Sequence, residues 1–351
     1  MSTHGNIITD LLPITPMEEV FRTIHNDGAD KYARLDELPK SLRDGLSAQE
    51  QELCWLMVKS YRGISLYENM FFDMDSDIFI NIHPRYCPLC IHRHNFFEIQ
   101  FALNKVIVQD IDDEHVTLQP GDICFIAPET EHVPLVFDDE TLILNILVRK
   151  STFQDTFFNL LKRDDIISDF FMRVLYSQSY HPFLICQTGS DSQVFATALQ
   201  MLELSTKSDY YSKKLLCLML EQLFIYLLRD HSTSFFSGNP ENKDDTRIVS
   251  ILQYIQQNFK TVTLSRAADD FGYNKTYFSR IVKNSTGTSF TQLVKILKLQ
   301  YAAGLLADSN MPISDIIIDC GYEDQTYFYR AFKGKYGSTP ADYRKQHNCR
   351  I

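Results

Sequence analysis

The chain lacks long apolar runs, a visible export signal and a dense set of cysteines. Its longest apolar stretches, such as Leu215 to Leu220, fall far short of the roughly 18 residues that a membrane-spanning helix needs. The N-terminus shows no basic segment followed by an apolar run. Eight cysteines are scattered over 351 residues, many inside apolar runs, which indicates reduced core residues rather than a disulfide framework. We therefore predict a cytoplasmic protein without a membrane partner.

What remains is the composition of an ordinary globular protein. Hydrophobic residues make up 44% and charged residues 23%, so the chain can bury a sizeable core. At about 100 to 200 residues per domain, this length predicts two or three domains.

The net charge of −11 conceals a division between the two ends of the chain. Residues 1–243 carry 20 basic and 35 acidic side chains, whereas residues 244–351 carry 14 basic and 10 acidic ones. A polar segment with both Gly and Pro, residues 237–245, separates them and is typical of a surface linker. Because phosphate binding is driven by Lys and Arg, only the last hundred residues are suited to nucleic acid.

Those last hundred residues contain an internal repeat. Segments that begin at Gly272 and Gly321 share six identities at an offset of 50 residues, in a frame of twelve. The recurring residues are Thr276, Tyr277, Phe278, Arg280, Lys283 and Gly287, which return as Thr326, Tyr327, Phe328, Arg330, Lys333 and Gly337. Such agreement is hard to attribute to chance.

Each copy is predicted to fold as helix, tight turn, helix. Apolar residues recur at helical spacing before each copy's first glycine, and Thr263 is a plausible N-cap of the earlier helix. Gly272 and Gly321 then end the first helices, because glycine readily takes the left-handed conformation that a tight turn requires. Two helices joined in this way form a helix-turn-helix unit, whose second helix can enter a DNA major groove.

The second helix of each copy has one polar face. Polar and basic residues stand at i, i+3, i+4 and i+7, while large apolar residues point elsewhere. These faces carry Thr276, Ser279, Arg280 and Lys283 in the first copy, and Thr326, Tyr329, Arg330 and Lys333 in the second. Any surface helix has a polar face. Its duplication, together with the local basic charge, favours double-stranded DNA as the partner.

Between the copies, residues 290–306 are predicted to form one connecting helix. About 17 residues at 1.5 Å each span roughly 25 Å, a length suited to holding two recognition helices near one turn of DNA apart. The expected target is two adjacent major grooves on one face of the duplex.

The region from Arg247 to Arg344 resembles the C-terminal domain of AraC/XylS-type transcription regulators. The second copy carries the resemblance, from Ile313 to the closing Thr-Pro and Tyr-Arg pairs. It departs from the family pattern at Cys320 and at the acidic pair of residues 323 and 324. The resemblance implies base contacts from Thr276, Ser279, Arg280, Gln325, Thr326 and Arg330. We add their neighbours Asn274, Lys275, Lys283, Tyr329 and Lys333 to the predicted DNA-binding set.

The N-terminal half has a different pattern, with short β-rich runs between about residues 78 and 149. In one of them His92, His94 and Glu98 share sequence parity, so on a strand they project to one face. With a later Pro-Gly-Asp turn and His132, this segment resembles the cupin barrel that AraC-type regulators commonly carry as effector domain. The resemblance implies that these four residues face an effector, or that they ligate a divalent metal.

Two observations bear on the metal alternative. The second histidine motif departs from the metal-binding pattern, with Val136 where such cupins tend to carry Asn, so we predict no obligatory cofactor and leave a divalent metal open. Cys87 and Cys90 precede His92 and His94, and the C-x-x-C spacing raises a competing zinc or thiol-redox site. The two histidines cannot serve both sites at once.

Helical segments flank the β-rich region. Residues 47–50, Ser-Ala-Gln-Glu, form a candidate capping box that opens a helix. The apolar stretches 192–204 and 212–229 precede the linker, and we take them as the candidate interface of a homodimer.

The sequence thus predicts a multidomain α+β protein: a helical extension (1–75), a cupin-like β-barrel (76–150), a helical segment (151–236), a linker (237–245) and an all-α double helix-turn-helix domain (246–351). The predicted function is a DNA-binding regulator that senses a small effector, is not an enzyme, and contacts RNA polymerase if it activates. A metal-dependent cupin enzyme fused to a DNA-binding domain, or a DNA-binding protein without an effector, are the alternatives.

Overall fold

A computed structural model describes residues 10–27, 44–54, 64–157, 170–175, 182–236 and 245–347, with short gaps inside several of these ranges. The chain divides into two compact units. We call residues 1–150 with 181–239 the β unit, and residues 151–180 with 240–351 the helical unit. This division places residues 181–236 with the β-rich region instead of with a separate helical segment.

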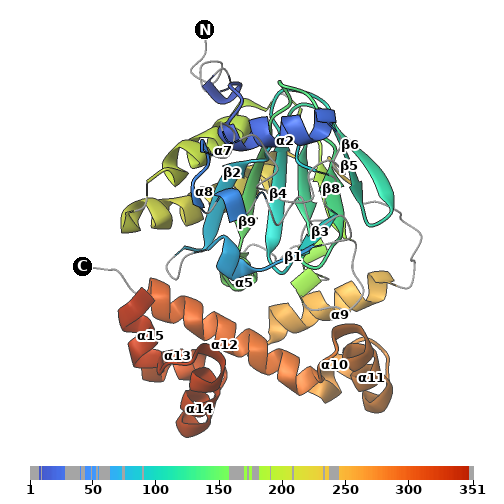
Figure 1. Ribbon diagram of the computed structural model, residues 1–351. Helices are drawn as coiled ribbons and strands as arrows, with labels where there is room; N and C mark the ends of the chain where they lie inside the picture. The colour runs from blue at the N-terminus through green and yellow to red at the C-terminus, as the bar shows by residue number, and fades with distance from the viewer. Residues whose placement is uncertain are drawn as a thin grey trace. The chain divides into compact units, whose positions relative to one another are not determined.

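The β unit consists of two sheets (Figure 1). The five-stranded sheet has the order β1-β3-β8-β5-β6, and the six-stranded sheet has the order β11-β10-β7-β4-β9-β2. The strands of the first sheet are β1 (Ile64–Leu66), β3 (His92–His94), β8 (His132–Pro134), β5 (Ile107–Ile111) and β6 (Glu114–Leu118). Those of the second are β11 (Phe235–Phe236), β10 (Phe183–Cys186), β7 (Ile123–Ile126), β4 (Phe97–Ala102), β9 (Ile143–Val148) and β2 (Ile78–Ile82). The fold is therefore cupin-like, although the described strands form two sheets and no closed barrel.

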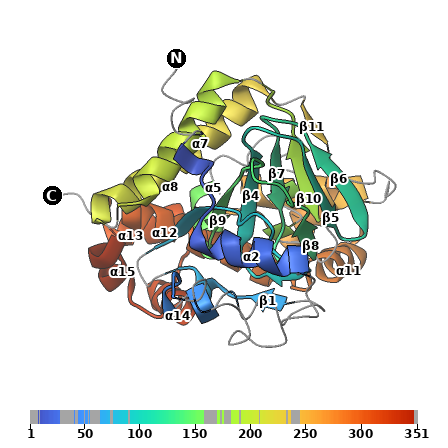
Figure 2. The ribbon, with the colours of Figure 1, turned by 45° about the horizontal axis from the view of Figure 1, so that its top comes forward.

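Helices cover the outer face of the six-stranded sheet, which explains its unbroken apolar runs. α7 (Ser192–Ser205) and α8 (Tyr210–Asp230) pack on each other and on β2, side by side in Figure 2. Phe224 of α8 lies against Phe125 of β7, with 5.4 Å between ring centroids. Because one face meets the core and the other meets the helices, every residue of β4 and β9 is buried.

A buried ion pair attaches the helix α2 (Pro16–Asp27) to the β unit. Arg85 donates from Nε to Glu18 Oε1 and from Nη2 to Oε2, both at 2.8 Å. Its remaining N–H groups reach the backbone carbonyls of Leu12, Pro13 and Asp139. The guanidinium is thus fully hydrogen-bonded although Arg85 is only 1% exposed.

The predicted capping box at residues 47–50 has both reciprocal bonds: Glu50 N–H donates to Ser47 Oγ at 3.2 Å and Ser47 N–H to Glu50 Oε2 at 2.8 Å. The end of that predicted helix, near residue 60, lies outside the described residues. A short 3-10 helix, η3 (Glu68–Met70), follows β1, and α5 (Lys150–Phe157) follows β9.

The helical unit contains two helix-turn-helix motifs that share one long helix. From residue 245 onward its helices are α9 (Asp245–Asn258), α10 (Leu264–Asp270), α11 (Lys275–Thr286), α12 (Phe290–Asp308), α13 (Ile313–Asp319), α14 (Gln325–Tyr336) and α15 (Pro340–His347). One core contains Phe278, Val282 and Leu297, and the other contains Ile316, Phe328 and Phe332. α12 contributes to both cores, as its position between the two motifs in Figure 1 illustrates. None of the described helices has the length and apolar character to cross a membrane.

Candidate nucleic-acid interface and effector cavity

The helices α11 and α14 begin and end in the same way. Asn274 accepts a hydrogen bond from the N–H of Tyr277 at 2.8 Å, and Asp324 accepts one from the N–H of Tyr327 at 3.0 Å. Each helix ends at a glycine in the left-handed conformation. The acidic residue at 324 is therefore explained as the N-cap of α14, since a carboxylate is favourable at a helix N-terminus.

The predicted DNA-binding side chains lie on the solvent-facing sides of α11 and α14. Ser279 is half-buried, and the other ten are exposed: Asn274, Lys275, Thr276, Arg280, Lys283, Gln325, Thr326, Tyr329, Arg330 and Lys333. The apolar residues of the same helices, Phe278, Val282, Phe328, Ala331 and Phe332, are buried. Each helix thus anchors its apolar face in its own core and leaves the opposite face for a partner.

A tyrosine supports the arginine on each of these faces. The guanidinium of Arg280 lies 5.2 Å from the ring centroid of Tyr277, and that of Arg330 lies 5.6 Å from that of Tyr327. A cation over an aromatic ring is attracted by the negative face of the ring, so each tyrosine limits the freedom of its arginine. The repeat contains both tyrosines, but sequence analysis assigned them no role.

A cavity of about 280 Å³ lies within the β unit. Both sheets line it, with Ile64, Leu66, His92, His94, Val133 and Pro134 from the first sheet, and Phe79, Asn81, Ile82, Glu98, Asn145 and Leu147 from the second. Its walls are mainly apolar. Three of the four residues predicted to face an effector, His92, His94 and Glu98, are among the lining residues.

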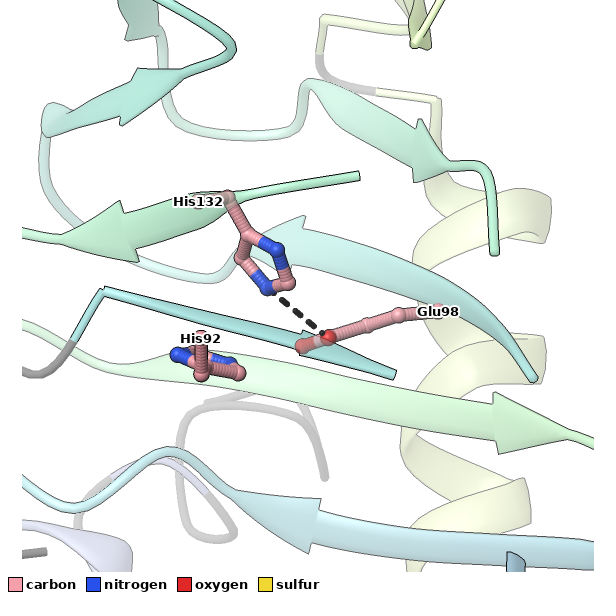
Figure 3. A group of neighbouring side chains, drawn as sticks. All are labelled: His92, Glu98 and His132. Carbon is pink, nitrogen blue, oxygen red and sulfur yellow. Dashed lines mark hydrogen bonds and ion pairs between the residues drawn. The ribbon is translucent and has the colours of Figure 1, made fainter. Parts of the chain in front are cut away.

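All four of these residues come together at one place, although the strand expected to carry three of them is split. His92 and His94 belong to β3 in one sheet, whereas Glu98 belongs to β4 in the other. His132 on β8 pairs with His92 in the strand register. Figure 3 shows His92, Glu98 and His132 converging from these strands.

The hydrogen bonds of this cluster fix the orientation of two imidazoles. Nε2 of His94 and Nε2 of His132 lie 2.9 and 3.2 Å from the same oxygen, Oε2 of Glu98. The Nδ1 atoms face the backbone carbonyls of Phe96 and Thr130 at 2.8 and 3.2 Å. A neutral imidazole has one N–H and can satisfy only one of two acceptors. Wherever Nδ1 carries the N–H, the Nε2 lone pair faces Oε2 of Glu98, an arrangement that a bound cation would satisfy.

The donor set fits a divalent metal ion. One ligand atom from each of His92, Glu98 and His132 lies within 4.8 Å of the others. A metal-ligating histidine usually donates its second ring N–H to an oxygen acceptor such as a carbonyl, as the Nδ1 of His132 is placed to do. Imidazole and carboxylate ligands suit Zn, Fe, Mn or Ni.

Burial perturbs the ionisable groups at the cavity. Burial raises the pKa of Glu98, but hydrogen bonds from His132 and His94 outweigh it and hold that pKa well below its ordinary value. Burial lowers the pKa of His83, which also lines the cavity, to about 4, so this histidine is neutral at pH 7.

Only part of the competing zinc site falls within the described residues. Cys87 lines the cavity and is half-buried, while Cys90 lies outside the described residues. Cys54, Cys124, Cys186 and Cys320 are buried and not in disulfides.

One polar residue of the cavity, Asn145, was not predicted from the sequence. Its Oδ1 is buried without a hydrogen-bond partner in the described part of the structure. Asn145 lies on a strand without a sequence motif, so only the cavity reveals it.

Parts of the chain are similar to known proteins. A family model described as "Helix-turn-helix domain" matches residues 267–346. The HTH-type transcriptional activator RhaS from Yersinia pestis (strain Pestoides F) is 26% identical over 259 residues, covering 73% of this chain and 89% of RhaS. Among solved structures, the C-terminal domain of AraT from Geobacillus stearothermophilus is 34% identical over 29% of this chain and 85% of that one, with a TM-score of 0.28. ToxT from Vibrio cholerae is 13% identical over 77% of this chain and 99% of its own, with a TM-score of 0.31.

The paired recognition helices, the matching domain and the similarity to RhaS define a DNA-binding transcription regulator. More narrowly, the chain resembles the AraC/XylS-type regulators, as its second helix-turn-helix copy predicted.

Proposed function

We propose that α11 and α14 read two adjacent major grooves of one DNA site, and that a small ligand in the β-unit cavity modulates this binding. The observation that carries the first part is the duplication of the interface: the same cap and the same arginine-tyrosine pair occur on both helices. The RhaS proteins are named as activators, so contact with RNA polymerase is the corresponding proposal for this chain.

In vitro selection from a random DNA pool with the full-length protein tests the DNA-binding residues. Each bidentate arginine-guanine contact contributes about 1 to 3 kcal/mol of discrimination. We expect Arg280→Ala to relax one half of the selected site and Arg330→Ala to relax the other half. Arg266→Ala is the control, because this exposed arginine lies on α10 and outside both recognition faces. Identical selected sites for all three variants would refute these assignments.

The lining of the cavity supports one class of effector. Apolar walls surround a polar end formed by the histidines and Glu98, and the unpaired Oδ1 of Asn145 is a hydrogen-bond acceptor. A complementary ligand has an apolar body and at least one hydrogen-bond donor. Such a ligand acts by binding more tightly to one arrangement of the two units than to the other.

A thermal-shift screen of small amphipathic compounds tests this part, because a ligand that binds only the folded protein raises its melting temperature. We expect Asn145→Leu to abolish the shift from any hit. His115→Gln should preserve it, because His115 is an exposed histidine that pairs with Asp110, outside the cavity lining. A hit whose shift is the same in both variants binds elsewhere.

A divalent metal at His92, Glu98 and His132 is a second candidate, favoured by the ligand atoms of these three residues, which all lie within 4.8 Å of one another. There it would supply a Lewis-acidic point for an oxygen-bearing effector. Metal analysis of purified protein, with melting temperatures before and after chelation, tests it. His132→Gln should lose the metal and His115→Gln should retain it. Measurable turnover of a substrate by metal-loaded protein would instead favour the cupin-enzyme alternative.

We also propose that α8 forms a homodimer. Its inner face is buried, but Tyr211, Leu215, Leu218 and Ile225 are exposed at intervals of 4, 3 and 7 residues, the spacing of a two-helix seam. Sedimentation should show Leu218→Glu as a monomer, whereas Glu203→Gln on α7 remains a dimer. A monomeric wild-type protein would disprove the proposal.

A further inference from the structure

We propose that Lys260, Asp319 and Gly321 form an interlock between the two helix-turn-helix motifs, and that this interlock sets the spacing between DNA half-sites that the protein accepts. The inference rests on the proposed reading of two grooves. It assigns these three residues a positioning role, because they act through the placement of α11 and α14.

The interlock joins residues that belong to different motifs. Lys260 lies in the turn between α9 and α10 of the first motif, and Asp319 ends α13 of the second. The Nζ of Lys260 donates to both carboxylate oxygens of Asp319, at 3.0 and 2.9 Å. It also donates to the hydroxyl of Tyr301 on α12 at 3.0 Å, and lies 4.3 Å from the centroid of that ring.

Tyr301 lies at the junction of the two motifs. Its ring packs against the apolar core of the first motif and also against that of the second. The ammonium of Lys260 is therefore held where both cores meet. Its hydrogen bond to Asp319 holds the pKa of that carboxyl below its ordinary value, which agrees with a formed ion pair.

The backbones of the two motifs also touch at Gly321. A Cβ atom on Gly321 would lie 2.1 Å from the carbonyl oxygen of Lys260, which is far inside van der Waals contact. The equivalent glycine of the first motif, Gly272, has nearly the same φ, +70° against +74°, but a Cβ there would meet nothing within 4 Å. Both positions need glycine for the left-handed turn, and only Gly321 needs it for close approach.

A third contact closes the same junction. Lys298 on α12 donates from Nζ to the carbonyl of Gly321 at 2.6 Å. The turn of the second motif is thus held from two sides, by Lys260 of the first motif and by the shared helix.

This arrangement adds a constraint that α12 alone does not supply. A single helix of 19 residues fixes the distance between two motifs along its axis, but each motif packs on it through a separate core. A side-chain ion pair and a backbone contact away from the helix axis oppose rotation of one motif relative to the other. With that rotation blocked, α11 and α14 can enter two grooves only at one separation.

The experiment measures the spacing preference of the full-length protein. The DNA site selected by the wild-type protein is remade with one or two base pairs added or removed between its halves. The measured quantity is the ratio of Kd values for altered and native spacing. For the wild-type protein we expect a penalty of about tenfold or more, comparable to a mismatched base pair. For Lys260→Met and Asp319→Asn we expect about threefold or less.

The two substitutions change the net charge in opposite directions. A general effect on phosphate attraction would therefore change the DNA affinities of the two variants in opposite directions. It would also cancel in the ratio of Kd values for altered and native spacing. Gly321→Ala and Gly272→Ala are a second matched pair, because both strain the same backbone conformation but only the former separates the motifs. Relaxed spacing in Lys260→Met, Asp319→Asn and Gly321→Ala, with Gly272→Ala unchanged, is the expected pattern.

Equal spacing penalties in the wild-type protein and the three interlock variants would overturn the inference and leave the two-groove reading intact. Recovery of a single, undivided site from the wild-type selection would overturn the two-groove reading itself, and the interlock with it.

Discussion

The ion pair between Glu18 and Arg85 offers the sharpest test of what holds the effector cavity together. Met17 on α2 and the segment that includes His83, Pro84 and Cys87 both line the cavity, and the pair joins α2 to that segment. Glu18→Gln removes the charge and leaves the shape nearly unchanged. The buried guanidinium would then lose its charged partner and keep the backbone carbonyls of Leu12 and Pro13 as acceptors.

The expected cost follows from that burial. Removing one partner of a buried pair costs about 3 to 5 kcal/mol, because the other charge is left uncompensated. For a unit of this size, each kcal/mol lowers Tm by about 2 to 4 °C, so a fall of roughly 6 to 20 °C is expected. Thermal unfolding followed by circular dichroism measures it. Glu19→Gln is the matched control, since Glu19 pairs with Arg22 at the surface and should change Tm little.

The same pair predicts a pH dependence. Burial raises the pKa of Glu18, but the hydrogen bonds from Arg85 and Thr15 outweigh it, so the folded-state pKa lies below the ordinary value. A carboxyl with a lowered folded pKa stabilises the protein above its unfolded pKa, and this contribution disappears as pH falls through the folded pKa. The gap in Tm between wild type and Glu18→Gln should therefore narrow as the solution is acidified below pH 4.5. If Glu18→Gln and Glu19→Gln have the same Tm at pH 7, the reasoning is refuted.

Three further outcomes are expected. Gly121→Ala should destabilise the β unit far more than Gly189→Ala. Both glycines have positive φ, but only a Cβ at position 121 would meet a backbone carbonyl oxygen, at 1.9 Å. The urea midpoints of the two variants measure this difference. Asp324→Ala should cost about 1 kcal/mol through loss of the α14 cap, and no change in urea midpoint would contradict the capping role. Tyr277→Leu should weaken DNA binding only when Arg280 is present. A double-mutant cycle that shows no coupling between the two residues would exclude a role for the Tyr277 ring in positioning Arg280.

The helical unit was predictable because its signals are local. The end of α10 at a glycine with positive φ, the N-cap at Thr263 and the extent of α12 depend on neighbours in sequence, and all three occur as expected. The two polar faces follow from helical periodicity. The interlock was not predictable, because Lys260 and Asp319 lie 59 residues apart and no local pattern connects them.

The β unit was less predictable, because its arrangement depends on contacts between distant segments. The β-rich runs predicted strands between about residues 78 and 149, where β2 to β9 lie, but not β1, β10 and β11. The run from His92 to Glu98 was expected to form one strand and instead divides between two sheets. Nothing local marks that division, since it arises from how the sheets close around the core. The division places the carboxylate of Glu98 opposite the histidines of the other sheet.

The sequence by itself therefore determined the class of protein, the two recognition helices and the residue types that converge in the cavity, because helical periodicity, caps and an internal repeat are encoded over short distances. Only the tertiary structure decided how those parts meet. The cavity wall at Asn145, the buried pair of Glu18 and Arg85, and the contact between Lys260 and Gly321 each join distant segments. Such contacts depend on the packing of whole elements, which no stretch of neighbouring residues specifies.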